Sequence, residues 1–228
     1  MKIKIKKPEN FFGIFHLIFT LITIIILLLP SELRIGIKLF ILVLIYNIGA
    51  LLLGLCSKDN LWLRIWVFSF MISVFQIFPD WFLSAELNIL VFPEDGLFKI
   101  GTVSGYMFGL WTIPLFIIIF SGNRVRQTFT EMKAALIVIA LALLIFGISE
   151  GTIWVIGSWY PQNVTTLFNH IAIYIIPAEL ILGFTSYYIF TLIKKKNLLF
   201  YLPLAFAIML LYLGSASFFY FLIEILLL

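Results

Sequence analysis

The chain of 228 residues has few charged side chains and a single cysteine. Charged residues make up 11% of it, whereas an ordinary soluble domain carries about 25%. Hydrophobic residues make up 63%, and the mean hydropathy is +1.16. So little charge cannot give a globule of this size a polar surface, which excludes a soluble enzyme, a nucleic-acid-binding protein and a disordered chain. The lone Cys56 excludes an internal disulfide and any metal site built from several cysteines.

Residues needed for several membrane chemistries are also missing. Two histidines cannot supply the histidine-rich di-iron site of a desaturase or hydroxylase, and no lysine lies mid-run to anchor a retinal Schiff base. The motifs H-E-x-x-H and the Walker loop do not occur. No paired acid-rich motif suits a magnesium-dependent prenyltransferase. We therefore expect no metal and no cofactor, which leaves acid chemistry, ligand passage or no chemistry.

Long apolar runs make up most of the chain. A helix needs about 20 mainly apolar residues to cross a membrane. The runs predict an all-α, polytopic membrane protein with one membrane domain over residues 1–228 and a retained first helix. The seven predicted spans are 11–29, 35–56, 61–79, 100–121, 133–150, 168–193 and 198–224. An acidic connection is expected over 80–99, and an aromatic interfacial loop over 151–164.

The basic residues are distributed unevenly between the predicted loops. With the N-terminus in the cytoplasm, only Arg34, Lys38 and Lys99 of the 15 basic residues lie on the outer side. Cytoplasmic loops carry an excess of Lys and Arg, so this bias predicts an inner N-terminus and an outer C-terminus. We expect the protein in the bacterial inner membrane. Most of the acids lie in the outer half or in outer loops, and acids contribute little to topology.

A polar stripe runs along the third predicted span. Ser69, Ser73, Gln76 and Asp80 follow one another at intervals of 4, 3 and 4 residues, so they share one helix face. Asp80 is expected at the outer end of this helix. Charged groups at membrane depth cost several kcal/mol and usually mark a function. Helix packing through small polar side chains is the alternative explanation for the stripe.

Glu179 is the most informative single residue. It follows Pro177 in the sixth predicted span, where a proline frees a backbone carbonyl and kinks the helix. A carboxylic acid that keeps its proton in apolar surroundings can act as a general acid. Asn169 shares the predicted helix face with Glu179. The acid therefore either takes part in chemistry or is satisfied by a partner such as Asn169.

A weak internal repeat relates Asp80 to Glu150. Each acid ends a helix that runs from the inner to the outer side, and an aromatic connection with a proline follows, Val91-Phe92-Pro93 or Trp159-Tyr160-Pro161. The next helix in each half contains a central proline. This order predicts a parallel two-helix repeat with both acids on the same side of the membrane. The two helix prolines are Pro114 and Pro177.

These motifs together resemble a known family. An acid at a helix end, an aromatic loop and a helix with P-x-E are similar to the integral-membrane lycopene cyclase domain of the heterodimeric bacterial, archaeal and fungal type. The small membrane-bound meroterpenoid cyclases look similar too. The family pattern is D, then G-x-W-x-F, then P-x-E-E, and the resemblance spans residues 61–193. Leu180 stands in place of the second glutamate of P-x-E-E. The matching residues are Asp80 with Phe92, Glu150 with Gly157 and Trp159, and Pro177 with Glu179.

The resemblance implies proton-initiated cyclisation of an isoprenoid without redox change and without a cofactor. Glu179 would donate the proton, while Asp80 and Glu150 would position it or stabilise the cation. Aromatic faces stabilise cations and would do so for a carbocation. The residues expected to bind the substrate are Gln76, Ser73, Asn169, Trp159, Tyr174 and Trp111.

Three functions stay open on the sequence. The first is a cyclase or isomerase-like enzyme that acts on a polyisoprenoid or carotenoid from the outer half of the bilayer. The second is a transporter or lipid-binding protein in which the stripe and Glu179 line a pathway. The third is a non-catalytic subunit of a membrane complex. The expected partners are membrane lipids and an isoprenoid-like ligand, with no nucleic acid, and a homo- or hetero-oligomer is open.

Overall fold

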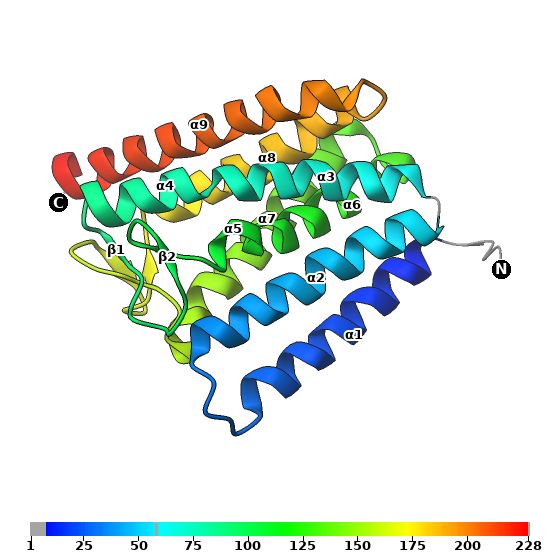
Figure 1. Cartoon of the computed structure of the whole chain (residues 1–228). Coiled ribbons are helices and arrows are strands. Elements are labelled where there is room, and N and C mark those ends of the chain that lie inside the picture. Colours follow the sequence, from blue (N-terminus) through cyan, green and yellow to red (C-terminus); the bar gives the residue numbers. More distant parts are fainter. Residues whose placement is uncertain (1–7, 58, 228) are drawn as a thin grey trace.

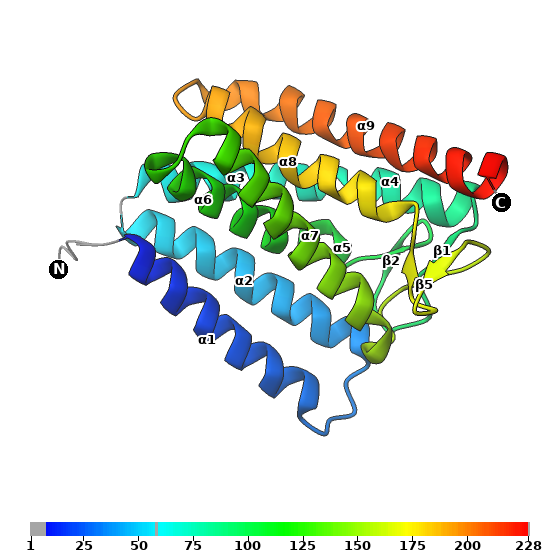
Figure 2. The same cartoon turned by 180° about the vertical axis from the view of Figure 1, so that it is seen from behind.

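The computed structural model describes residues 8–57 and 59–227, and its helices lie side by side in one bundle (Figures 1 and 2). Within these residues seven helices are long and apolar enough to cross a membrane. The prediction of an all-α, polytopic membrane protein is therefore confirmed. The seven spans are Phe11–Leu28, Ile35–Ser57, Asn60–Glu86, Met107–Thr128, Glu131–Ile156, Ile175–Ile193 and Leu198–Leu227.

Several spans are made of more than one helical segment. The α-helices are α1 (Pro8–Leu28), α2 (Ile35–Ser57), α3 (Asn60–Phe75), α4 (Ile77–Trp81), α5 (Met107–Leu110), α6 (Thr112–Thr128), α7 (Glu131–Ile156), α8 (Ile175–Ile193) and α9 (Tyr201–Tyr220). Two π-helical segments, η1 (Phe82–Glu86) and η3 (Phe221–Leu227), extend the third and seventh spans, and a 3-10 turn, η2 (Leu198–Phe200), precedes α9. The start of α1 and the end of η3 lie at opposite ends of the bundle (Figure 1), as an odd number of spans requires.

Prolines explain where two of the spans break. A proline lacks the N–H that would bond to the carbonyl four residues earlier. Pro79 therefore leaves the carbonyl of Phe75 without its helical partner, and α3 ends at Phe75. Pro114 does the same to Leu110, where α5 ends. In both places the chain returns to helix after one residue, so each span continues across the break.

Several span boundaries differ from the predicted ones. The third span runs on through Glu86, so Asp80 lies within the helix rather than at its end. The fourth starts at Met107 instead of 100 and continues to Thr128, beyond its predicted end at 121. The fifth continues to Ile156, where Gly157 in the left-handed region (φ 69°) ends it. The sixth starts at Ile175 instead of 168, so Pro177 lies in its first turn, where the missing N–H has no helical partner to lose and no kink results.

Short strands form a cover at the end of the bundle where the C-terminus lies (Figure 1). Strand β1 (Leu90–Val91) pairs antiparallel with β4 (Tyr160–Pro161), in the register Leu90↔Pro161 and Val91↔Tyr160. Two hairpins complete the cover. One joins β2 (Lys99–Ile100) to β3 (Val103–Ser104), and the other joins β5 (Thr166–Leu167) to β6 (Ile171–Ala172).

The same order of elements occurs twice in the chain. A long helix, a short strand, a hairpin and a second helix follow one another from α3 to α6 and again from α7 to α8. Asp80 lies ten residues before β1 (80 to 90), and Glu150 lies ten before β4 (150 to 160). Because β1 and β4 also pair with each other, the two units meet about an approximate two-fold axis at their strands. The predicted match of the helix prolines is not kept. Counted from the hairpins, Trp111 is the equivalent of Glu179, since each lies seven residues after its hairpin (104 to 111 and 172 to 179).

Candidate functional site

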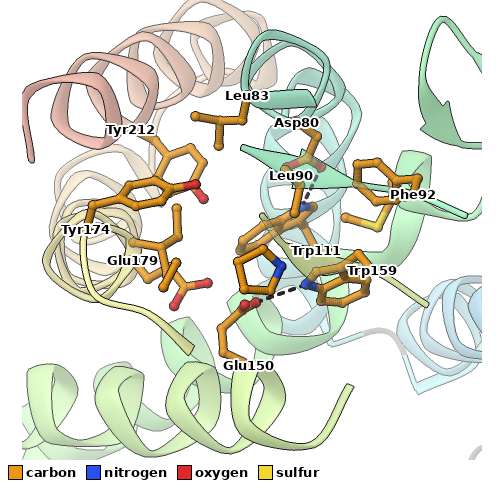
Figure 3. Close-up of a pocket in the computed structure, with 14 residues that line it drawn as sticks. Asp80, Leu83, Leu90, Phe92, Trp111, Glu150, Trp159, Tyr174, Glu179 and Tyr212 are labelled. Carbon is orange, nitrogen blue, oxygen red and sulfur yellow. Dashed lines mark hydrogen bonds between the residues drawn. The ribbon is translucent and has the colours of Figure 1, made fainter. Parts of the chain in front are cut away.

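The carboxyl groups of Asp80, Glu150 and Glu179 line one cavity beneath the strands (Figure 3). They come from three different elements, α4, α7 and α8. Asp80 and Glu179 are each 3% exposed, whereas Glu150 is half-buried. The remaining lining residues are apolar or aromatic, and they are Leu83, Leu90, Phe92, Met107, Trp111, Trp159, Pro161, Ala172, Tyr174, Ile175 and Tyr212.

Tryptophans hold two of the three acids. The indole Nε1 of Trp111 donates to Oδ2 of Asp80 at 3.2 Å, and Nε1 of Trp159 donates to Oε1 of Glu150 at 3.3 Å. Trp111 is the single residue between α5 and α6. Because Pro114 causes this break in the helix, it also affects where the Trp111 indole lies. Trp159 follows the left-handed Gly157, which turns the chain back over the end of α7.

Glu179 is placed differently from the other two acids. The carboxyl group points into the space between Glu150 and Tyr174 (Figure 3). Among the residues drawn there, the two hydrogen bonds are those of Asp80 and Glu150, and neither involves Glu179. A carboxyl group without a fixed donor is free to turn its proton toward a bound molecule. Glu179 therefore has the freest geometry for proton transfer within this cavity.

Among the residues that the structure describes, no basic side chain lines the cavity. Burying several negative charges without a positive partner is costly, so the arrangement favours acids that hold protons. Within the described residues, no group of three His, Cys, Asp or Glu side chains is close enough to hold a metal ion. The carboxyl groups thus surround a space and do not converge on one point.

Two tyrosines close the side of the cavity opposite Trp159. Tyr174 and Tyr212 are almost fully buried, and Figure 3 shows their rings beside Glu179. Tyr174 immediately precedes α8, and its ring meets Tyr220 edge to face at 5.7 Å. Burial raises the pKa of the Tyr174 phenol, and the nearby carboxyls of Glu150 and Glu179 raise it further. This hydroxyl therefore stays neutral and contributes a donor rather than a negative charge.

The expected substrate-binding residues divide into three groups. Trp111, Trp159 and Tyr174 line the cavity. Ser73 and Gln76 are fully buried on the stripe behind Asp80 and do not line it. Ser73 donates to the carbonyl of Phe108 at 3.4 Å, and neither amide atom of Gln76 has a partner among the described residues.

Asn169 is a correction to the predicted site. It is exposed at the tip of the β5–β6 hairpin with φ 65°, and it does not line the cavity. The expectation that it shares a helix face with Glu179 is wrong, because α8 starts only at Ile175. The apolar hairpin Thr166–Ala172 reads like helix in a hydropathy pattern, and this misplaced the helix start.

Tyr212, Phe92 and Met107 line the cavity and were not among the expected binding residues. The sequence motif that pairs Asp80 with Phe92 could have indicated that Phe92 lies at the site. Tyr212 is a polar aromatic residue in the middle of α9, away from both membrane interfaces, and that position was the available signal.

Comparison with known families adds one match. A family model described as a domain of unknown function, DUF6989, matches residues 77–223. The chain belongs to this family. The DUF6989 region begins with α4 and ends in η3, so it contains all three acids and most of both repeat units. Helices α1, α2 and α3 lie outside it. Neither a search of curated proteins nor a search of solved structures finds a match.

The cavity is small, but it is continuous with a second space. Its volume is about 30 Å³, which holds one or two water molecules. A second space of about 150 Å³ adjoins it between α6 and α7. The two share five lining residues, which are Met107, Trp111, Glu150, Trp159 and Glu179. A ligand larger than water would therefore occupy both.

Proposed function

We propose that this DUF6989 protein is a membrane-embedded, cofactor-independent isomerase that protonates and cyclises an isoprenoid-like lipid. The observation that carries the proposal is the meeting of three carboxyl groups in one covered apolar cavity, whose described walls are aromatic and contain no basic side chain. The charge distribution of the loops supports an inner bacterial membrane and an outer position for this cavity.

The chemistry assigns one role to each side chain. Glu179 gives its proton to a carbon–carbon double bond, which leaves a carboxylate and a carbocation. A second double bond of the same molecule attacks the cation, which closes a ring and moves the positive charge. A carboxylate then takes a proton from the neighbouring carbon, and a new double bond forms. Protons balance and no electrons are lost, so the product is an isomer of the substrate.

The walls stabilise the charged intermediate in this scheme. The faces of Trp111 and Trp159 attract a cation through the negative charge of their π systems. The hydrogen bonds from these indoles fix the carboxyl groups of Asp80 and Glu150 at the edge of the cavity. Preorganised groups of this kind lower the barrier because they need not move as charge develops.

The test is product analysis in cells that make linear isoprenoids. We expect a ring-containing isomer of unchanged mass in the lipid extract, separated by chromatography and identified by mass spectrometry. Glu179→Gln keeps the shape of the side chain but removes the acid, and should abolish the isomer. The matched control is Glu94→Gln, since Glu94 lies on the outer loop, pairs with Lys99 at 3.0 Å and is 85% exposed. An unchanged lipid profile across all substrates supplied refutes the proposal.

Transport is a second candidate, and one observation favours it. Buried hydroxyl groups on α3, α6 and α8, and the buried amide of Gln76 between α3 and α4, have no partner among the described residues, although buried polar groups normally have one. A passing polar molecule or proton would supply such partners. Uptake or proton flux in vesicles that is lost in Gln76→Leu, without any new lipid product, would favour transport over isomerisation. The residues with these unpartnered buried hydroxyl or amide groups are Ser69, Gln76, Thr112 and Ser186.

A further inference from the structure

The acid cavity is covered on the side where the strands lie. Leu90, Phe92 and Pro161 of the paired connections form its roof. Polar contacts hold this cover together. The hydroxyls of Tyr106 and Ser158 lie 2.6 Å apart, and Nε2 of Gln162 donates to Oδ1 of Asn88 at 2.6 Å across the two connections. A ligand that comes from water at this end would have to open a hydrogen-bonded cover.

The opposite situation holds on the flank between α6 and α7. The 150 Å³ space there has walls of half-buried apolar side chains, Leu110, Ile113 and Pro114 on one side and Ile153 on the other. Both helices belong to membrane spans, so this flank faces lipid and not water. Glu150 and Glu179 line this space as well as the acid cavity.

The exposure of the three acids agrees with an opening on this flank. Asp80 and Glu179 are almost fully buried, but Glu150 is only half-buried. Glu150 also lines both spaces, with Ser149 and Ile153 beside it on α7. An acid at membrane depth that its own protein covers only in part is rare, because charged groups there normally face the bundle interior. Glu150 thus marks the point where the flank space joins the cavity.

We propose that the space between α6 and α7 is a lateral portal through which one end of a linear, apolar membrane lipid reaches the carboxyl cluster. The volume of the space limits the part of the lipid that can enter. An apolar protein cavity of about 150 Å³ holds a single benzene molecule, so the portal takes a terminal group of about one six-membered ring. The rest of the chain stays in the bilayer. The proposal deepens the isomerase function and rests on it for the chemistry, but not for its test.

The test compares two carbodiimides, which add to a protonated carboxyl group to form an O-acylisourea. Where water is excluded this rearranges to a stable N-acylurea, and at a water-exposed carboxyl added glycine ethyl ester displaces the urea and leaves a stable amide. The protein is reconstituted in phosphatidylcholine vesicles and treated with apolar dicyclohexylcarbodiimide or with a charged, water-soluble carbodiimide. Peptide mass spectrometry then locates the adducts. We expect the apolar reagent to label Glu150 and the water-soluble reagent to leave it unlabelled, because no water reaches it from the flank. Glu94 on the outer loop should show the reverse pattern in the same sample.

Portal variants link the labelling to this flank. Ile153→Trp fills the portal and should abolish the Glu150 adduct, whereas Ile153→Ala widens it and should increase the adduct. The matched control is Ile148→Trp, which adds the same bulk to the lipid-facing side of α7, where Ile148 is 56% exposed and outside the portal. Glu150→Gln removes the acceptor and sets the background.

Each labelling result either supports or overturns the portal. Labelling by the water-soluble reagent, labelling by neither reagent, or equal labelling in Ile153→Ala and Ile153→Trp overturns the portal. The readout needs no turnover, so its failure is separate from the failure of the isomerase function. Glu150 labelled through the flank without any cyclised lipid would keep the portal and refute only the isomerase.

Discussion

A close approach between α7 and α8 predicts a large effect of one methyl group. A Cβ atom added to Gly183 on α8 would lie 2.7 Å from Cβ of Ala142 on α7, and 3.4 Å from atoms of Ile118 and Phe146. Carbon atoms in contact rest about 3.5–4.0 Å apart, so the shortfall at Ala142 is about 1 Å. Both Cβ atoms are fixed to their backbones and cannot rotate away. Gly183→Ala therefore has to push the two helices apart.

A matched glycine isolates the cost of this clash. Overpacking of this kind costs about 1–3 kcal/mol. Gly→Ala also stabilises a helix interior by about 1 kcal/mol, and this gain obscures the clash in a single variant. Gly147 on α7 has no atom within 4 Å of an added Cβ, so Gly147→Ala has the gain without the clash. We expect the free energy of unfolding of Gly183→Ala to be lower than that of Gly147→Ala by about 1–3 kcal/mol.

The assay is reversible unfolding in mixed detergent micelles, followed by circular dichroism as the denaturing detergent increases. The double variant Gly183→Ala with Ala142→Gly moves the methyl group across the interface and should recover most of the loss. Because α7 carries Glu150 and α8 carries Glu179, the single variant should also lower product formation. Equal unfolding free energies for the Gly183 and Gly147 variants would refute the close packing of α7 on α8.

Three further predictions follow from other contacts. Glu224 accepts hydrogen bonds from the backbone N–H of Thr165 at 2.9 and 3.0 Å and from its hydroxyl at 3.0 Å, so Glu224→Ala should lower the free energy of unfolding by about 1–3 kcal/mol and Glu224→Gln by less, measured in the same detergent assay. Tyr106→Phe removes the hydroxyl that bonds to Ser158, so limited proteolysis should cut the connections that carry the strands faster than in the parent protein. An unchanged rate would show that this contact does not hold the cover. A C-terminal alkaline phosphatase fusion should be active and a C-terminal green fluorescent protein fusion dark, because seven spans and an inner N-terminus put the C-terminus outside; the reverse pattern refutes the predicted orientation.

The spans were predictable because a lipid bilayer imposes one strong rule. Backbone groups in hydrocarbon must be satisfied within the segment, so long apolar runs become helices. The cover of strands was not predicted, because the same rule assigns any apolar run to a helix. Its hairpin Thr166–Ala172 contains Leu167, Phe168 and Ile171, and hydrophobicity alone does not separate short strands from helix. The proline breaks could be placed in principle, since Pro79 and Pro114 determine them directly.

The acids of the site could be found because charge is scarce in this chain. Asp80, Glu150 and Glu179 lie in or at the end of apolar runs, and the structure places all three around one cavity. Positions that depend on tertiary contacts were not predictable. Tyr212 joins the cavity from the last span, and no local pattern relates it to the acids. The portal depends on the spacing of two helices, which a sequence pattern does not give.

The approximate two-fold relation of the two units has a consequence for how such a site arises. Two identical copies of one unit, meeting through their strands, would enclose a cavity with the same residues on both sides. Fusion into one chain lets the halves diverge independently. The pair of equivalent positions now holds Trp111 in one half and Glu179 in the other, while Asp80 and Glu150 remain a matched pair. The pocket therefore has an indole at one of these positions and a carboxyl group at the other, so its two halves offer different chemistry to a bound molecule.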